Sequence, residues 1–321
     1  MIEAFYTDEF VLPLPAGHRF PMEKYRILRN KVALTLQSVS LVVPPAATVG
    51  QLALAHCPTY IHKVESGHLT PQEQRDIGFP WSNRMVERSL RSVGATVAGI
   101  RSALQHGASV NLAGGTHHAK RQQGGGFCVF NDLAVAARVF QTDRIAQFRE
   151  RGELGVLRLP NRVLVLDLDV HQGDGTAEIL EGDSSVFTFS MHGDRNYPFQ
   201  KARSDLDIAL PDGTGDDAYL ETLQKALSEI EQQFKPDLLL YVAGLDAHAS
   251  DRLGKLSLTD RGIEQRDLVV LNWAAKFDLP VVAVMAGGYF RDLEHLTDLQ
   301  LDVVSRLAAY GANLKKQGIQ N

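Results

Sequence analysis

Short apolar runs alternate with longer amphipathic segments over the second half of the chain. Four of these runs have the length of buried strands: Val163–Leu168, Val186–Ser190, Leu238–Val242 and Val281–Met285. Asp216–Phe234 and Thr259–Phe277 lie between or after them and repeat apolar residues at helical spacing. Because strands alternate with helices, the pattern predicts a parallel sheet with helices on both faces.

The N-terminal third has a different pattern. The first 106 residues are predicted to be mostly helical, most clearly at Met85–His106, and the Pro44-Pro45 pair predicts a loop. A last helix is expected at about Asp292–Tyr310. No repeat, low-complexity tract or flexible linker divides the chain. We therefore expect a single α/β domain over residues 1–321, with a central, mostly parallel sheet flanked by helices on both faces.

Composition narrows the class of protein. The chain has 321 residues, 44% of them hydrophobic, which is enough for a large core. Its net charge of -5 gives no basic footprint for direct nucleic-acid binding and mildly favours a cationic substrate. Two cysteines are too few for a disulfide framework, and no leader or membrane-spanning apolar run is evident. We expect a cytoplasmic protein without a membrane partner.

Chemically capable residues follow four of the predicted strands. In open α/β sheets, ligands bind beyond the carboxyl ends of the strands. The residues concerned are His117 and His118 after Val110–Leu112, Asp169, His171 and Asp174 after Val163–Leu168, Asp246 after Leu238–Val242, and Tyr289 after Val281–Met285. One such ending is ordinary, but four together predict one site assembled from strand-end loops.

The segment around Asp169 predicts a divalent metal site. Asp167, Asp169 and His171 are spaced two apart and point the same way for as long as strand geometry lasts. Buried carboxylates beside an imidazole are costly unless a cation or hydrogen bonds compensate. Asp169, His171 and Asp246 form a plausible Zn²⁺ set that leaves a position for water. The spacing alone does not decide between Asp167 and Asp169, and Asp246 or His171 taken singly is more typical of a cap or a loop.

Further residues suggest acid–base chemistry. Adjacent His117 and His118 can serve as base and acid if carboxylates orient them, and Asp167 and Asp174 are available for this. Tyr289 can donate its hydroxyl to an oxyanion. Each has an ordinary alternative, a solvated loop for the histidines and a core-edge side chain for the tyrosine.

Glycines after the histidine pair give the site a second wall. Gly124–Gly126 allow close backbone approach to a ligand, and Phe127 adds an apolar surface. Arg26, in the helical stretch Met22–Leu36, is by itself typical of a solvated face.

Together these motifs resemble the zinc-dependent histone deacetylase family. The matching segments occur in family order over most of the chain: Gly17-His18, Pro21-Met22, Arg26-Ile27, His117-His118, Gly124–Cys128, Asn131, Asp167–Gly175, Ser190–His192, Asp246 and Gly287–Tyr289. Gln172, Tyr197-Pro198 and Gly244–Gly254 look closest to the class IV branch and to compact bacterial members. The resemblance implies an arginase/deacetylase-like fold.

The resemblance also implies roles for individual residues. It makes Asp169, His171 and Asp246 the ligands of one catalytic zinc, and Tyr289 the group that polarises the acyl carbonyl. It makes His118, paired with Asp174, the main proton shuttle, and His117, paired with Asp167, mostly electrostatic. Gly126, Phe127 and Tyr197 would line a tunnel for the lysine stem, and Arg26 would lie near an internal channel. A monovalent cation such as K⁺ would lie near Asp167, Asp169, His171 and Ser190.

The implied activity is removal of an acetyl or other acyl group from a lysine side chain in a protein or peptide, or from a small acylated amine. Alternatives are a binuclear manganese ureohydrolase of the arginase type, an acetylpolyamine deacetylase and a non-catalytic reader of acyl-lysine. Gln172 stands where many class I members have a second histidine, and Tyr197 replaces a tunnel phenylalanine. These departures bear on the substrate rather than on hydrolysis. The sequence leaves open the acyl length, the oligomeric state and whether zinc or iron is the native metal.

Overall fold

A continuous parallel sheet forms the centre of the molecule. The computed structural model describes residues 1–15, 17–151 and 161–318. Within these residues eight strands pair in the order β2-β1-β3-β8-β7-β4-β5-β6, and every pairing is parallel. Their bounds are β1 Ile2–Phe5, β2 Val39–Val42, β3 Ala108–Asn111, β4 Val163–Asp167, β5 Val186–Gly193, β6 Leu206–Leu210, β7 Leu238–Val242 and β8 Val281–Val284.

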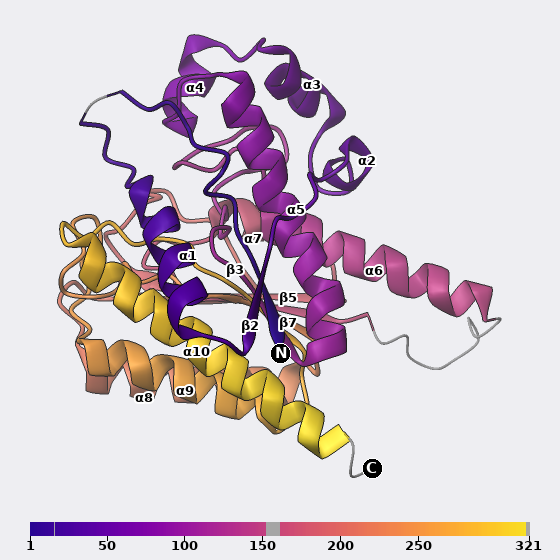
Figure 1. Ribbon diagram of the computed structural model, residues 1–321, viewed down its shortest axis with the longest axis vertical. Helices are drawn as coiled ribbons and strands as arrows, with labels where there is room; N and C mark the ends of the chain where they lie inside the picture. The colour runs from indigo at the N-terminus through magenta and orange to yellow at the C-terminus, as the bar shows by residue number, and fades with distance from the viewer. Residues whose placement is uncertain (16, 152–160, 319–321) are drawn as a thin grey trace.

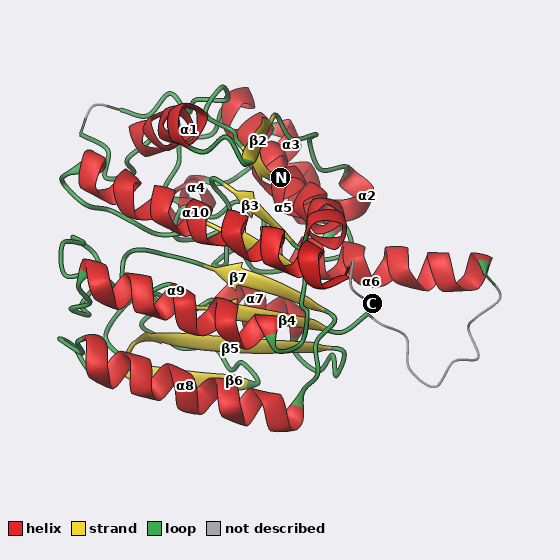
Figure 2. Ribbon diagram, turned by 60° about the horizontal axis from the view of Figure 1, so that its bottom comes forward, coloured by secondary structure: helices red, strands yellow, loops and turns green. Residues whose placement is uncertain are grey.

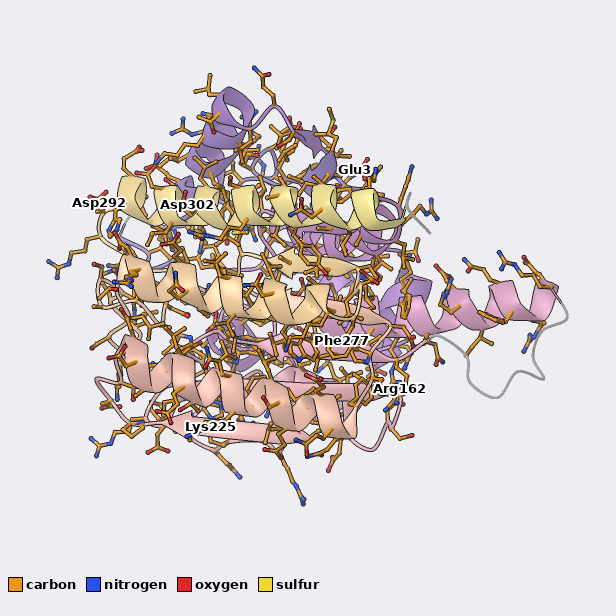
Figure 3. The ribbon with its side chains drawn as sticks, turned by 90° about the horizontal axis from the view of Figure 1, so that it is seen from below. Glu3, Arg162, Lys225, Phe277, Asp292 and Asp302 are labelled. Carbon is orange, nitrogen blue, oxygen red and sulfur yellow. The ribbon has the colours of Figure 1, made fainter. Side chains whose placement is uncertain are left out.

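Helices cover both faces of this sheet, as the sequence pattern predicts. The layer of α1, α8, α9 and α10 lies on one face, and α5, α6 and α7 lie on the other (Figures 1 and 2). Figure 3 looks onto the first layer, with Lys225 on α8 and Asp302 on α10. The bounds are α1 Glu23–Thr35, α2 Val49–Leu52, α3 Pro58–Ser66, α4 Pro71–Ile77, α5 Asn83–His106, α6 Asp132–Glu150, α7 Asp174–Leu180, α8 Asp216–Gln233, α9 Asp260–Ala275 and α10 Leu293–Gly318.

The strand β4 shows why the sheet needs both layers. Leu164 and Leu166 belong to the core beneath α8, α9 and α10, whereas Val163 and Val165 belong to the core beneath α5 and α6. Successive side chains of a strand point to opposite faces. A strand covered on both faces therefore reads as an unbroken apolar run instead of an alternating one.

The N-terminal third is helical but not wholly so. β1 and β2 extend the sheet beyond β3, and β2 is only half-buried along its length. The Pro44-Pro45 segment lies in the loop that follows β2. β6 at the opposite edge is likewise half-buried over most of its length, and the sequence pattern did not predict it. β2 and β6 are the two edge strands of the sheet, and their mixed composition lacks the apolar run of a central strand.

The four strands whose endings suggested chemistry are neighbours. They form the uninterrupted central series β3-β8-β7-β4. Because all four are parallel, the loops after them meet at one edge of the sheet. Within the described residues no helix combines the length and apolar character that crossing a bilayer requires.

The helix α5 packs closely enough on the Pro44-Pro45 loop to require a glycine. It begins after Ser82, whose side chain accepts a hydrogen bond from the backbone N–H of Met85. A Cβ placed on Gly94 would lie 1.9 Å from the carbonyl oxygen of Pro45. Helix propensity favours alanine over glycine by about 1 kcal/mol, but here overpacking opposes it.

We expect Gly94→Ala to lower the free energy of unfolding by about 1–3 kcal/mol, the usual range for overpacking in a well-packed site. Gly50→Ala is the matched control, because a Cβ there meets only the Thr48 hydroxyl at 3.9 Å. Urea denaturation followed by circular dichroism measures both. Equal stability of the two variants would contradict the close packing at Gly94.

Candidate active site

Two aspartates and a histidine converge at the carboxyl ends of β4 and β7. The Nδ1 atom of His171 lies 2.9 Å from Oδ1 of Asp169 and 3.1 Å from Oδ2 of Asp246. One ligand atom from each of the three lies within 4.8 Å of the others. Both carboxylates are buried. We call these three residues the donor group.

The backbone holds the donor group in place. The N–H of Gly287, in the loop after β8, donates to Oδ2 of Asp169 at 2.8 Å. The N–H of Val170 donates to Oδ1 of Asp246 at 2.9 Å. A Cβ on Gly287 would lie 1.8 Å from Oδ2 of Asp246, so only glycine allows this approach.

The strand geometry that would point Asp167, Asp169 and His171 the same way does not continue beyond Asp167. β4 ends at Asp167, and the backbone N–H of His171 donates to Oδ1 of Asp169 at 2.9 Å in the turn that follows. Asp167 is not part of the donor group: its Oδ2 accepts from Nδ1 of His117 at 2.7 Å, and its Oδ1 accepts from the backbone N–H of Asp169 at 3.1 Å. The geometry therefore separates two aspartates that the spacing could not distinguish.

The electrostatics of the donor group suit a cation. Burial and the neighbouring Asp169 raise the pKa of Asp246 to about 7. Burial opposes the charge on His171, but hydrogen bonds to both carboxylates outweigh it and raise the pKa of His171 to about 10. Without an ion, a proton on the imidazole thus offsets the repulsion of the two acids. Two carboxylates and an imidazole are also a ligand set that a divalent metal accepts, so the residues present fit one.

Two histidine–aspartate pairs lie beside the donor group. Nδ1 of His117 lies 2.7 Å from Oδ2 of Asp167, and Nδ1 of His118 lies 2.7 Å from Oδ1 of Asp174. The two imidazole centroids are 4.1 Å apart. The ring of His118 is also 5.9 Å from that of His171. Each carboxylate fixes Nδ1 as the protonated nitrogen and leaves Nε2 as the other reactive atom.

The two pairs differ in charge. Burial lowers the pKa of His117, but Asp167 and Asp169 reverse this and raise it to about 9. Burial and the charge on His117 lower the pKa of His118 to about 4, despite the hydrogen bond to Asp174. Neighbouring groups with pKa values pushed apart are the arrangement that divides acid and base roles.

Residues at the start of α6 hold the histidine loop. The N-cap residue Asn131 donates from Nδ2 to the carbonyl oxygens of His117 and Ala119 at 3.3 and 3.1 Å. Asp132 is fully buried and accepts from the backbone N–H of Thr116 at 2.8 Å. The sequence reasoning did not single out Asp132. The available signal was the Asn-Asp pair before an apolar helix, which is typical of a helix start.

One cavity of about 1060 Å³ opens at this site, and its lining includes Asp169, His171, His117, His118 and Asp174. Gly126 lies against the His118 ring, where a Cβ would approach Cδ2 to 2.6 Å, and the ring of Tyr197 packs edge-on at 4.8 Å from that of His118. Phe127 adopts φ +67°, and its N–H donates to the carbonyl oxygen of Ile77 at 2.7 Å. The structure thus brings the three predicted tunnel residues to the cavity wall.

Tyr289 closes the cavity on the β8 side. Its ring centroid is 6.1 Å from that of Phe127, and its side chain is buried. Burial and the charges of Asp169 and Asp246 raise its pKa well above the ordinary value, so it keeps its proton. Its hydroxyl has no hydrogen-bond partner within the described residues, which leaves the proton available to a ligand.

Arg26 is a predicted site residue that the structure places on the outer surface instead of at the site. Its side chain is 59% exposed and lies 3.8 Å from Glu23 on the surface of α1. The buried cation of this helix is Lys24, two residues earlier, whose Nζ donates to the carbonyl oxygens of Ala286 and Gly288 at 3.3 and 3.2 Å. The expectation for Arg26 is wrong because two residues along a helix turn the side chain to the opposite face.

The cavity is more basic than the chain as a whole. Its exposed lining includes the cations Arg19, Arg75, Arg195 and Lys255. The net charge of -5 therefore does not describe the surface that a substrate meets first, and the expected preference for a cationic substrate loses its support.

A second group with metal-compatible donors consists of His248, Asp260 and His295. The backbone N–H of Ser250 donates to Nδ1 of His248 at 3.0 Å, so the neutral ring carries its proton on Nε2. That Nε2 lies 2.9 Å from Oδ1 of Asp260 and donates to it. The nitrogen facing the carboxylate has no free lone pair for a metal, and the group serves to join the β7 loop to the first turns of α9 and α10.

Comparison with known proteins identifies the family. Residues 18–305 match the histone deacetylase domain. An uncharacterized protein of Picosynechococcus is 44% identical over 91% of this chain and 93% of its own length. Histone deacetylase 2 of Arabidopsis thaliana is 29% identical over 84% of this chain and 69% of its own. The crystal structure of an HDAC homolog complexed with SAHA covers 99% of this chain and 88% of its own, with a TM-score of 0.78 at 24% identity, and shows the same fold. The resemblance drawn from the motifs is confirmed, and the chain belongs to the histone deacetylase family.

Proposed function

We propose that this protein is a zinc-dependent deacylase that hydrolyses the amide of an acylated lysine or a related acylated amine. The observation that carries the proposal is the donor group beside two histidine–aspartate pairs, with Asp169, His171, both histidines and Tyr289 lining one cavity. Among the described residues the Tyr289 hydroxyl has no hydrogen-bond partner. Membership in the histone deacetylase family supports the same chemistry. Iron remains an alternative to zinc at the same three residues.

Asp169, His171 and Asp246 would hold the metal. When bound, Zn²⁺ supplies Lewis acidity and brings the pKa of a coordinated water near neutrality. With three protein ligands, such a metal would keep room for a water. The N–H groups of Gly287 and Val170 hold the carboxylates of Asp169 and Asp246 in place.

The remaining residues divide the proton transfers. His118 has the lower pKa, so its Nε2 is the base that accepts a proton from the attacking water, while Asp174 holds its Nδ1. His117 carries the positive charge and stabilises the developing oxyanion electrostatically. Tyr289 donates its hydroxyl to the acyl oxygen. The water oxygen bonds to the carbonyl carbon, the C–N bond breaks, and the proton held by His118 passes to the leaving amine.

Two further elements accompany this proposal. We expect a monovalent cation such as K⁺ near Asp167, Asp169, His171 and Ser190, which the pairing of Asp167 with Ser190 across β4 and β5 supports. We also expect a cytoplasmic location, in keeping with two unpaired cysteines.

The arginase-type alternative needs two metals joined by shared ligands. In the described residues the donor group and the second group have no residue in common. In the second group, His248 has its proton toward the carboxylate of Asp260. The arrangement favours one metal with separate acid–base residues. A non-catalytic reader is disfavoured because the His117 and His118 pairs have no role in binding alone.

We expect the purified protein to bind about one zinc per chain and to hydrolyse at least one of three substrates: an acetyl-lysine peptide, a fatty-acyl-lysine peptide or an acetylpolyamine. A chelator should abolish turnover, and zinc should restore it. Asp246→Asn should lose the metal, whereas Asp260→Asn, in the second group, should retain it. Metal analysis and an amine-release assay measure both. Two manganese ions per chain, or metal loss only in Asp260→Asn, would contradict the assignment.

Tyr289→Phe tests the hydroxyl separately from the metal. Because a transition-state hydrogen bond of this kind is worth roughly 3–4 kcal/mol, we expect kcat to fall about 10²–10³-fold with zinc content unchanged. Tyr310→Phe is the control. Tyr310 lies in α10, and its buried hydroxyl donates to the carbonyl oxygen of Leu279. It should keep wild-type turnover. Normal turnover by Tyr289→Phe would remove that residue from the mechanism.

A further inference from the structure

The cavity contains a buried cation that the proposed hydrolysis does not use. Arg88, on α5, is 7% exposed and lines the same cavity as the donor group. Its Nε and Nη2 atoms are buried without a hydrogen-bond partner. Within the part of the chain that the structure describes, Arg88 has no ion pair either. A buried, unpaired guanidinium is costly, so its presence in a ligand cavity calls for a ligand.

Among the described residues, aromatic rings are the groups that compensate the charge of Arg88. Its guanidinium carbon lies 4.7 Å from the ring centroid of Tyr25 and 5.7 Å from that of Phe20. Such contacts stabilise a cation but leave its N–H donors unsatisfied. Two acids that line the cavity, Asp169 and Asp174, are engaged by histidines.

Arg88 lies in the inner part of the cavity, away from the mouth. Arg88 and Ser92, one turn further along α5, are both buried in the lining, whereas Arg19, Arg195 and Lys255 are exposed and mark the mouth. Phe20 is close to both Arg88 and Tyr289. Its ring centroid lies 5.7 Å from the guanidinium carbon of Arg88 and 6.5 Å from the ring centroid of Tyr289. An acyl-lysine with its carbonyl at Tyr289 would extend the lysine stem toward the mouth and the acyl chain inward.

We propose that Arg88 binds a carboxylate at the far end of the acyl chain, so that the enzyme accepts lysine acylated with a dicarboxylic acid such as a succinyl or glutaryl group. The inference rests on the proposed function and adds the substrate class. A guanidinium matches a carboxylate in charge, and the carboxylate would approach Nη1, because Nε and Nη2 are buried beneath protein atoms. The basic mouth favours the approach of such an anionic substrate. Hydrolysis breaks the same amide C–N bond with water and yields the free lysine amine and a dicarboxylic acid.

The test compares two acyl groups of the same shape. Peptides carry succinyl-lysine or its uncharged succinamoyl isostere, and the measured quantity is the ratio of their kcat/KM values. We expect wild type to prefer the succinyl peptide and Arg88→Met to lower this ratio about tenfold or more, as loss of a hydrogen-bonded charge partner requires. Arg88→Lys should retain part of the preference. Arg101→Met, an exposed arginine on the same helix, should leave the ratio and the turnover unchanged.

A second measurement keeps the test independent of turnover. Calorimetric binding of the same two peptides to Tyr289→Phe, with and without Arg88→Met, should show the same charge preference and the same loss. An unchanged ratio in Arg88→Met, or hydrolysis of acetyl-lysine by wild type without a succinyl preference, would overturn the assignment of Arg88 while the deacylase proposal stands. Failure to hydrolyse acetyl, succinyl and succinamoyl peptides alike would instead contradict the deacylase proposal, and the binding data would still decide the role of Arg88.

Discussion

The structure depends on burying two carboxylates side by side at the end of a parallel sheet. Asp169 and Asp246 are both buried and repel one another, and burial raises the pKa of Asp246 to about 7. Backbone N–H groups from Gly287 and Val170, together with the imidazole of His171, offset part of this repulsion. The glycines, the parallel order of the central strands and the turn after β4 are all needed to bring these donors within reach. A divalent cation bound to the donor group would offset the rest.

Sequence reasoning succeeded where one physical rule dominated. The runs that became β4, β7 and β8 are buried on both faces, so their apolar character alone marked them as strands. Their parallel order then placed Asp169, Asp246 and Tyr289 at one edge. The edge strands β2 and β6 were missed because partial exposure gives them mixed composition. β1 was also missed; it is mostly buried but only four residues long. The resemblance pointed to Arg26 by its position in a motif. Two positions along a helix turn a side chain to the opposite face, and the fold buries Lys24 and exposes Arg26.

Other features depend on contacts between distant parts of the chain. Asp132 fixes the histidine loop through Thr116, and no spacing rule connects these two positions. The tautomer of His248 is set by the backbone of Ser250, which excludes a metal site that the donor types alone would allow. The charge of the cavity also differs from the charge of the chain. Local side chains, Arg88 and the basic mouth among them, decide what a substrate experiences at short range.

The anchoring of the two carboxylates by backbone N–H groups has a consequence for how the ion enters. In small zinc-stabilised domains the ligands come together only as the ion binds, and binding and folding are one event. Here the ligands are fixed by a sheet whose core does not involve them, so the apoprotein is expected to be a folded receptor. Ion exchange in such a site needs no unfolding. The species that occupies it in a cell is then governed by the supply of free ions and by their intrinsic order of affinity for nitrogen and oxygen ligands.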